Sequence, residues 1–417
     1  MPLVAGVFLS TDVAQALTLD EYYVAALKRS EVVAIQGELI RQAEEHHSQA
    51  NAGVLPTVNG VASYTRQDPV PTGASANSTS PNRQSLAKLS ATQPLFRGFR
   101  EFAALRQTQS LLDAQSEDYR NACTQLFKDV AQNFYTVLSI EQDLKNVDEE
   151  IKQNIDREKE INERVRIGRS RASEALTIQS TISTLRAETQ QLQGQLSVAR
   201  EAFAYLSGLS PATPLHDTED MSVNPKPLDD YLTRLALRPD VKAAQQRLMA
   251  ADENMTVARG ARLPSLDLNA NRYFKRSGYL KDSEWDAGLI LTVPLYAGGL
   301  LQSKIGEAVS QRMQAELSAS QVSRQAEQEI RAAYQKVVFD QSQVDALEKA
   351  TESARKNYEA QRRDYRLGLV TNLDVIQALT AFQQNQQALD RARFTTRLDY
   401  VTLQAAAVYL PPETPAP

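Results

Sequence analysis

The side chains best suited to catalysis form no catalytic pattern in this sequence. His46 and His47 are adjacent and cannot share one face of a helix, and His216 lies in a proline-rich segment. Adjacent carboxylates such as Glu149 and Glu150 are typical of a solvated helix face rather than of an acid–base pair. The sequence contains no phosphate loop, no nucleophile elbow and no Cys/His spacing of a metal site. We therefore expect a protein that is not an enzyme and that uses no cofactor and no metal.

Charged residues gather instead around two related turns. Arg166-Ile167-Gly168 returns 200 residues later as Arg366-Leu367-Gly368. In each turn the glycine fits the left-handed end of a helix, and the arginine complements the helix dipole. Glu174 and Asp374 follow the two turns, where a carboxylate favours the start of the next helix. We expect both turns to lie at the same end of the helices that they join.

The turns belong to a unit of about half the chain that is present twice. Leu55-Pro56 returns as Leu263-Pro264, and the residues 93–98 (Gln-Pro-Leu-Phe-Arg-Gly) return as 293–298 (Val-Pro-Leu-Tyr-Ala-Gly). These offsets are far longer than the repeat of a solenoid, which is about 20–50 residues. The sequence predicts a first repeat over residues 17–210, a linker over 211–228 and a second repeat over 229–409.

Each repeat contains one very long helical pattern. Apolar residues recur in steps of three and four over residues 98–166 and again over 300–366. At 1.5 Å per residue such a helix measures about 100 Å. Shorter helical patterns flank the long ones, at residues 20–52, 172–206, 229–261 and 372–409. The helices could run side by side, and a set of coiled-coil, spectrin-like bundles is the alternative.

Between the short and the long helix, each repeat carries two segments of alternating polarity. They cover residues 57–66 and 84–95 in the first repeat, and residues 264–273 and 285–296 in the second. In the last segment one face collects Trp285, Ala287, Leu289, Leu291 and Val293. Alternation over about ten residues fits a strand that crosses a bilayer with its apolar face toward lipid. A soluble hairpin with one buried face would alternate in the same way.

A membrane role for these strands would require several chains. A membrane-spanning helix needs about 18 apolar residues in a row, and no apolar run in this sequence is that long. Only strands could therefore span a bilayer. Four strands cannot close a barrel, and an open sheet edge is not tolerated in lipid. Three chains would supply twelve strands around a water-filled lumen. If the strands span a membrane, several chains must associate. The sequence pattern does not show that their number is three.

Composition narrows the class of protein further. Hydrophobic residues make up 42% of the chain and aromatic residues only 6%, which favours long, narrow helical packing. A formal charge of −5 argues against a nucleic-acid partner. Residues 1–16 fit the end of an export signal, with a frayed N-terminus as the alternative. Residues 410–417 form a Pro-rich tail, and the single cysteine, Cys123, supports no disulfide and no metal site.

Taken in order, these features resemble the TolC-like outer-membrane efflux protein family over nearly the whole chain. The resemblance is carried by the duplication, by Arg238-Pro239-Asp240-Val241, by the two Pro-Leu-aromatic-x-Gly turns and by Gly368-x-x-Thr371-x-x-Asp374-Val375. It implies a mainly α protein with a small membrane β part, built from a duplicated helix–β-hairpin–helix–helix unit. A long periplasmic α-helical tunnel would continue a 12-stranded β-barrel shared by three chains, with the linker as an equatorial belt.

The resemblance also implies a periplasmic gate. Tyr365 and Asp374 match the family's gate tyrosine and a lumenal aspartate, and Glu174 matches an acidic position in the first repeat. Gln377 stands where the best-known members have a second aspartate, which predicts a weaker cation filter. Symmetry would turn each inward carboxylate into a ring that attracts cations. The residues implied to contact an adaptor at the tips are Gly168, Arg169, Ser173, Gly368, Thr371 and Asn372.

The function implied by the resemblance is an exit channel in the outer membrane of a Gram-negative bacterium, with a large periplasmic extension. Such a channel passively conducts drugs, small molecules or polypeptides in a tripartite efflux or type I secretion system. The implied partners are a homotrimer, a periplasmic adaptor (membrane fusion) protein, an inner-membrane pump of the RND, ABC or MFS type, and outer-membrane lipid, without nucleic acid. The alternative is a periplasmic coiled-coil adaptor or structural protein that forms no channel.

Overall fold

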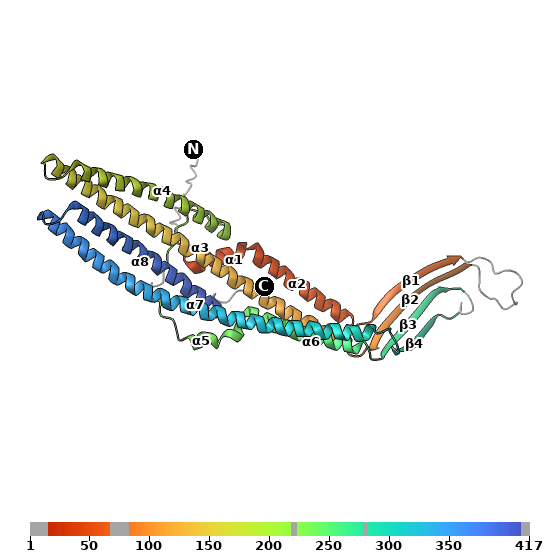
Figure 1. Cartoon of the computed structure of the whole chain (residues 1–417). Helices are drawn as coiled ribbons and strands as arrows, with labels where there is room; N and C mark the ends of the chain where they lie inside the picture. Colours follow the sequence, from red (N-terminus) through yellow and green to blue (C-terminus); the bar gives the residue numbers. More distant parts are fainter. Residues whose placement is uncertain (1–15, 67–82, 218–222, 278–281, 410–417) are drawn as a thin grey trace, which may run out of the picture. The chain divides into compact units, whose positions relative to one another are not determined.

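The computed structural model describes residues 16–66, 83–217, 223–277 and 282–409. They form mainly α-helices with one four-stranded antiparallel sheet, so the predicted mainly helical fold with a small β part is confirmed (Figure 1). None of the described helices is both long enough and apolar enough to cross a membrane. The predicted Pro-rich tail lies outside the described residues, as does the predicted export signal apart from Ala16.

The elements occur in the same order in both halves of the chain. The first half contains α1 (Leu19–Arg29), α2 (Glu31–Ala52), β1 (Thr57–Arg66), β2 (Arg83–Phe96), α3 (Arg100–Arg166) and α4 (Ala172–Ser207). The second contains α5 (Leu228–Leu232), the 3-10 helix η1 (Leu235–Leu237), α6 (Pro239–Gly260), β3 (Ser265–Arg276), β4 (Trp285–Thr292), α7 (Leu300–Arg366) and α8 (Asn372–Ala406). The long helices α3 and α7 have 67 residues each.

The chain divides into two compact units that do not follow the two repeats. Unit 1 comprises residues 1–34, 120–238 and 325–417, and unit 2 comprises residues 35–119 and 239–324. Each unit therefore contains part of both repeats, and α3 and α7 each contribute to both units. The duplication is thus interleaved in space rather than folded as two successive domains.

The first short helix of each repeat is interrupted, which the apolar pattern did not predict. The helix expected over residues 20–52 stops at Ser30, whose backbone is extended with ψ 111°. The helix expected over residues 229–261 is divided before Pro239, which opens α6. Proline suits the first position of a helix because its missing N–H has no helical partner there. The apolar steps continue across both interruptions, so periodicity alone could not reveal them.

The sheet of unit 2 has the strand order β1-β2-β3-β4, and its register gives it two chemically different faces. Val58, Ala91, Ala270 and Ala287 lie opposite one another across the four strands. The neighbouring row on the other face consists of Asn59, Ser90, Asn271 and Asp286. Because side chains alternate along each strand, the whole sheet follows this division into an apolar and a polar face.

The end of β4 corrects one prediction. The strand stops at Thr292 and not at residue 296, so Val293 lies beyond the last paired residue. Pro294 follows and has no N–H to donate to a neighbouring strand. The corresponding Pro94 lies within β2, where the register with β3 shifts between Pro94 and Phe96.

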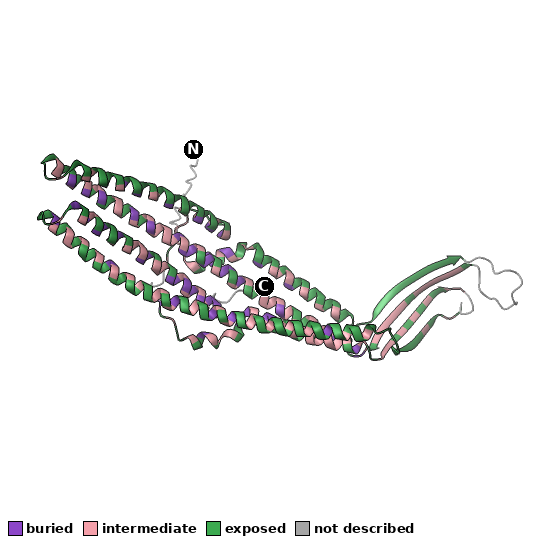
Figure 2. Ribbon diagram, in the orientation of Figure 1, coloured by how far each residue is buried: buried purple, intermediate pink, exposed green. Residues whose placement is uncertain are grey.

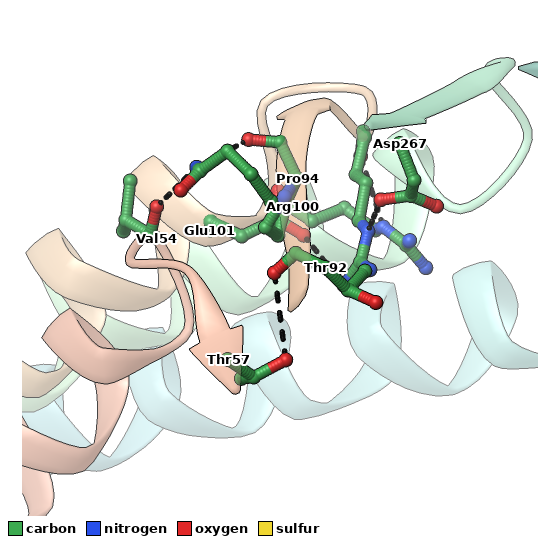
Figure 3. A network of polar contacts seen from close by, with 9 residues as sticks. Val54, Thr57, Thr92, Pro94, Arg100, Glu101 and Asp267 are labelled. Carbon is green, nitrogen blue, oxygen red and sulfur yellow. Dashed lines mark hydrogen bonds and ion pairs between the residues drawn. The ribbon is translucent and has the colours of Figure 1, made fainter. Parts of the chain in front are cut away.

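The passage from β2 into α3 is held by a close backbone contact with the end of α6. Gly98 has φ +69°, and a Cβ added there would lie 2.3 Å from the carbonyl oxygen of Gly260. Nearby, Gln93 donates to the carbonyl oxygens of Val54 and Pro94, at 2.9 and 2.8 Å (Figure 3). Arg97 donates through Nε to Asp267 at 2.8 Å. These contacts fix the sheet on the helices of unit 2.

Aromatic residues take part in two of the cores of unit 1, one in each repeat. Tyr22 of α1 packs on Phe203 of α4 with a ring centroid distance of 4.6 Å. Tyr231 of α5 packs with Ile330 and Leu403, which lie on α7 and α8. Figure 2 shows the buried residues concentrated along the helices, whereas none of the residues in the four strands is buried in the single chain.

Candidate functional site

Both long helices end in the same hydrogen-bonded turn in unit 1. Gly168 and Gly368 have φ 72° and 78°. Gly168 N donates to Val165 O at 3.0 Å, and Arg169 N donates to Arg164 O at 2.8 Å. The bonds from residues 368 and 369 to residues 365 and 364 repeat this pattern. It is the Schellman motif, in which glycine adopts the left-handed conformation after the last helical residue.

Asp374 completes a capping box at the start of α8. Its Oδ2 accepts hydrogen bonds from Thr371 N at 2.8 Å and from Thr371 Oγ1 at 2.6 Å, while Asp374 N donates back to Thr371 Oγ1. The hydrogen bonds from Thr371 lower the pKa of the Asp374 carboxyl, so it remains charged at neutral pH. In a single chain this geometry supports the role of Asp374 in starting the helix.

The first repeat caps its helix differently. Arg171 occupies the cap position of α4 and makes no side-chain capping bond. Glu174 instead accepts a hydrogen bond from Ser170 Oγ at 3.0 Å. Ser170 Oγ also lies 3.5 Å from the hydroxyl of Tyr365. The structure therefore brings Glu174 and Tyr365 together through Ser170, whereas no such link joins them to Asp374 among the described residues.

The ring of Tyr365 is buried and contacts two arginines of α3. Cζ of Arg157 lies 4.6 Å from the ring centroid and Cζ of Arg164 lies 4.4 Å from it. Such contacts are attractive because the ring face is electron-rich. Arg157 is itself only 5% exposed on its side chain, and it donates to Asn372 Oδ1 from Nε at 3.2 Å and from a terminal nitrogen at 2.6 Å. Arg157 thus ties α3 to both α7 and α8.

Sequence reasoning missed Arg157, and a signal for it was present. Asn154, Arg157 and Ile161 are all buried and follow one another in steps of three and four along α3. Arg157 therefore occupies a position of the apolar stripe, and burial lowers the pKa of its guanidinium. A charged residue in such a stripe needs partners, and Glu160 at 3.6 Å, Asn372 and Tyr365 provide them.

Asn372 packs inside the tip in the single chain. It is 4% exposed and accepts a hydrogen bond from Arg157, while its predicted contact with an adaptor stays a prediction. Gln377 and the other five predicted tip residues, Gly168, Arg169, Ser173, Gly368 and Thr371, are exposed. Large apolar residues that the sequence analysis did not single out are exposed beside them: Ile167, Leu176, Leu367, Leu369 and Leu373.

The second notable surface is the sheet of unit 2. Trp285, Leu289 and Leu291, on its apolar face, are 67%, 64% and 64% exposed, and Ala287 on the same face is also exposed. The polar face carries a hydrogen-bond network across β2, β3 and β4. Lys88 Nζ donates to Asn271 at 2.9 Å, and Asp286 accepts from Asn271 at 2.7 Å and from Tyr273 at 2.8 Å.

These features define a class of protein. A sheet that exposes an apolar and a polar face, carried on very long helical hairpins, is the arrangement expected of a subunit of an outer-membrane channel. The profile described as "Outer membrane efflux protein" matches residues 23–209 and 233–407.

Individual relatives agree with this match over nearly the whole chain. Outer membrane protein TolC of Escherichia coli is 22% identical and covers 97% of this chain and 85% of its own length. Outer membrane efflux protein BepC of Brucella suis is 21% identical and covers 94% and 85%. The crystal structure of the outer membrane protein VceC of Vibrio cholerae has the same fold, with a TM-score of 0.82, 20% identity and coverage of 93% and 96%.

The chain belongs to the outer membrane efflux protein family. It is an outer-membrane protein of a Gram-negative bacterium, and its family consists of efflux channels rather than enzymes.

Proposed function

We propose that three copies of this chain form a passive exit channel through the outer membrane. Within the described residues, β1 and β4 each pair on one side only, so the sheet has two free edges. Pairing β4 of one copy with β1 of the next would remove every edge, which lipid requires. Three sheets of four strands would make a barrel of about twelve strands, wide enough for a water-filled lumen.

The two-faced register of the sheet is the observation that carries this proposal. A soluble sheet would bury its apolar face, but here no residue of that face is buried on any of the four strands. A barrel would place this face against lipid, and the network around Asp286 would face water in the lumen. A single arrangement then accounts for both faces and for the free edges.

We propose that the tip of unit 1 is the periplasmic gate of this channel. Tyr365 holds α7 against α3, and a widening of the tip would require its contacts with Arg157 and Arg164 to separate. Glu174 and Asp374 would contribute carboxylates near the opening, repeated by symmetry as rings that attract cations. Gln377 is neutral, which would leave the cation preference weaker than two aspartates would make it.

The exposed apolar residues of the tip turns support a docking role. A periplasmic adaptor would bury Leu367, Leu369 and Ile167, which are 73%, 71% and 60% exposed. The energy for export would come from an inner-membrane pump, and the pump would select the drugs, small molecules or polypeptides.

The linker, residues 211–228, would form a belt around the helices. Its Leu215 already forms a parallel bridge with Leu17.

Purified protein tests the proposal directly. A channel requires detergent, migrates as a trimer in native electrophoresis and produces discrete conductance steps in a planar bilayer. A periplasmic adaptor or structural protein would remain soluble or fractionate with the inner membrane, and it would conduct nothing. A stable monomer without membrane affinity would exclude the channel.

A further inference from the structure

Basic side chains gather on the apolar face of the sheet, at the strand ends that lead away from the helices of unit 2. Arg66 is the last residue of β1 and Arg83 is the first of β2, and they lie directly opposite each other. Figure 1 shows that this end of the sheet is remote from the helices of the same unit. Like charges at opposite positions repel, so the pair destabilises the sheet unless an anion is close.

Two residues of β3 extend this group on the same face. Arg272 lies opposite Leu89, and Lys275 lies opposite Ala87. The register of β2 and β3 shifts between Ala87 and Lys88, and this shift places Lys275 on the apolar face. Leu89 and Ala87 share the face of Arg83 because side chains alternate along β2. Arg66, Arg83, Arg272 and Lys275 are called the strand-end basic cluster below.

On β3, Arg272 and Lys275 lie opposite Leu89 and Ala87, which are six and four residues from Arg83 along β2. Each member lies at the loop-facing end of its strand or within four residues of it. Trp285, the first residue of β4, lies opposite Arg272 rather than opposite the last residue of β3. In a barrel the strands are tilted, so residues at the same depth in the membrane are offset along neighbouring strands. Tyr64 and Trp285 flank the cluster on the same face and are 65% and 67% exposed.

The cluster is short of negative partners. Arg272 lies 2.8 Å from Glu284, but the side chains of Arg66, Arg83 and Lys275 form no hydrogen bond or ion pair with any residue that the structure describes. On the polar face the basic residues are paired, since Lys88 binds Asn271. Basic residues without partners beside exposed aromatic rings are typical of the level of lipid headgroups in a membrane protein.

We propose that the strand-end basic cluster binds the phosphate groups of anionic lipid headgroups around the sheet. This inference rests on the proposed membrane insertion. The guanidinium of arginine matches phosphate oxygens in a bidentate geometry, and the aromatic rings fit the boundary between headgroup and acyl chain. Each basic residue near an anionic surface raises lipid affinity about fivefold. The lipid would supply the negative charge that Arg66 and Arg83 lack within the described chain.

Trp285 is the only tryptophan of the chain and serves as the probe. The full protein is reconstituted in phosphatidylcholine vesicles that contain a small, equal fraction of acyl-labelled dansyl lipid, either phosphatidylglycerol or phosphatidylcholine. Energy transfer from Trp285 should be about threefold or more stronger to the anionic label. The variant Arg66→Gln, Arg83→Gln, Lys275→Gln should bring the ratio of the two transfers close to one. The single variant Arg83→Gln should give an intermediate ratio.

Arg276→Gln is the matched control, because Arg276 lies at the same strand end but opposite Leu86, on the polar face. It should keep the ratio of the unmodified protein. A ratio of one in the unmodified protein, or an unchanged ratio in both cluster variants, would overturn the inference while conductance still supported the channel. Protein that neither inserts nor conducts would overturn the proposed function, and the inference with it.

Discussion

Tyr365 is held mainly through its ring rather than through its hydroxyl. The guanidinium groups of Arg157 and Arg164 both lie over the ring, whereas the hydroxyl has only the 3.5 Å contact with Ser170. Tyr365→Phe should therefore keep the closed conductance, and Tyr365→Ala should raise it severalfold because α7 loses its attachment to α3. Single-channel recording of the two variants side by side checks this. Equal conductance of Tyr365→Ala and the unmodified protein would refute the gate assignment.

Substitution can separate the capping role of Asp374 from its proposed gate role. Asp374→Asn removes the charge and keeps an acceptor for the helix start, whereas Thr371→Ala keeps the charge and removes the cap. If Asp374 acts as a gate charge, Asp374→Asn should lower cation preference and Thr371→Ala should not. Thr371→Ala should instead cost about 1 kcal/mol of stability. Reversal potentials measured across a salt gradient decide the matter, and an unchanged potential in Asp374→Asn would leave Asp374 a capping residue only.

At the scale of elements, two neighbouring acidic residues, Asp340 and Asp399, lie where α7 packs on α8. Oδ2 of Asp340 and Oδ2 of Asp399 are buried without a partner among the described residues, and Lys336 Nζ lies 2.8 Å from Asp399 Oδ1. Burial, and then the neighbouring Asp399, raise the pKa of Asp340 to about 6. The folded state therefore binds more protons than the unfolded state between pH 4 and pH 6, roughly. Stability should fall as pH rises through this window.

The measurement is the thermal unfolding of the protein in detergent, followed by helical circular dichroism at pH 5 and pH 7.5. The melting temperature should be higher at pH 5, and Asp340→Asn should reduce the difference. Glu150, whose pKa is raised to about 7 by burial and then by Glu188, contributes in the same direction. Glu150→Gln should therefore reduce the difference further. A pH dependence that Asp340→Asn leaves intact would contradict the role of the pair.

The junction between β2 and α3 depends on a glycine. Gly98→Ala would place a Cβ 2.3 Å from the backbone oxygen of Gly260, and the left-handed backbone of residue 98 costs about 1–2 kcal/mol in addition. We expect a large loss of folded protein.

Gly306→Ala is the matched control, since a Cβ at Gly306 meets nothing within 4 Å. It should be neutral or stabilise α7 by about 0.5–1 kcal/mol. Folded yields of the two variants provide the comparison.

Elements with strong local signals could be predicted from the sequence, and long-range partners could not. The end of α3 follows from Gly168, and the two-faced strands follow from alternation. The interruption at Ser30 could not be predicted, because apolar spacing continues through it. The buried state of Asn372 depends on Arg157, a residue 215 positions away in the chain. Only the folded arrangement of α3 beside α8 reveals that pair.

At the scale of the whole molecule, the duplication explains where the free edges lie. β2 belongs to the first repeat and β3 to the second, and they form the central pair of the sheet. β1 and β4 are left at opposite edges and run antiparallel to their neighbours. Because the strands alternate in direction and number four, β4 of one copy can continue antiparallel to β1 of the next. Association can therefore extend the sheet without changing its pattern.

Charges placed on the two faces of β4 test this association. Leu289→Arg with Leu291→Arg puts two charges on the apolar face, and each costs about 2–4 kcal/mol near the middle of a bilayer. This variant should fail to form trimers in the outer membrane.

Gly288→Arg with Ile290→Arg places the same charges on the same strand but on the polar face, opposite Asn269 and Asp267. That control should assemble and conduct less, because its arginines would narrow a water-filled lumen. Membrane fractionation and native electrophoresis of both variants provide the readout, and normal trimers of the first variant would show that the apolar face does not meet lipid.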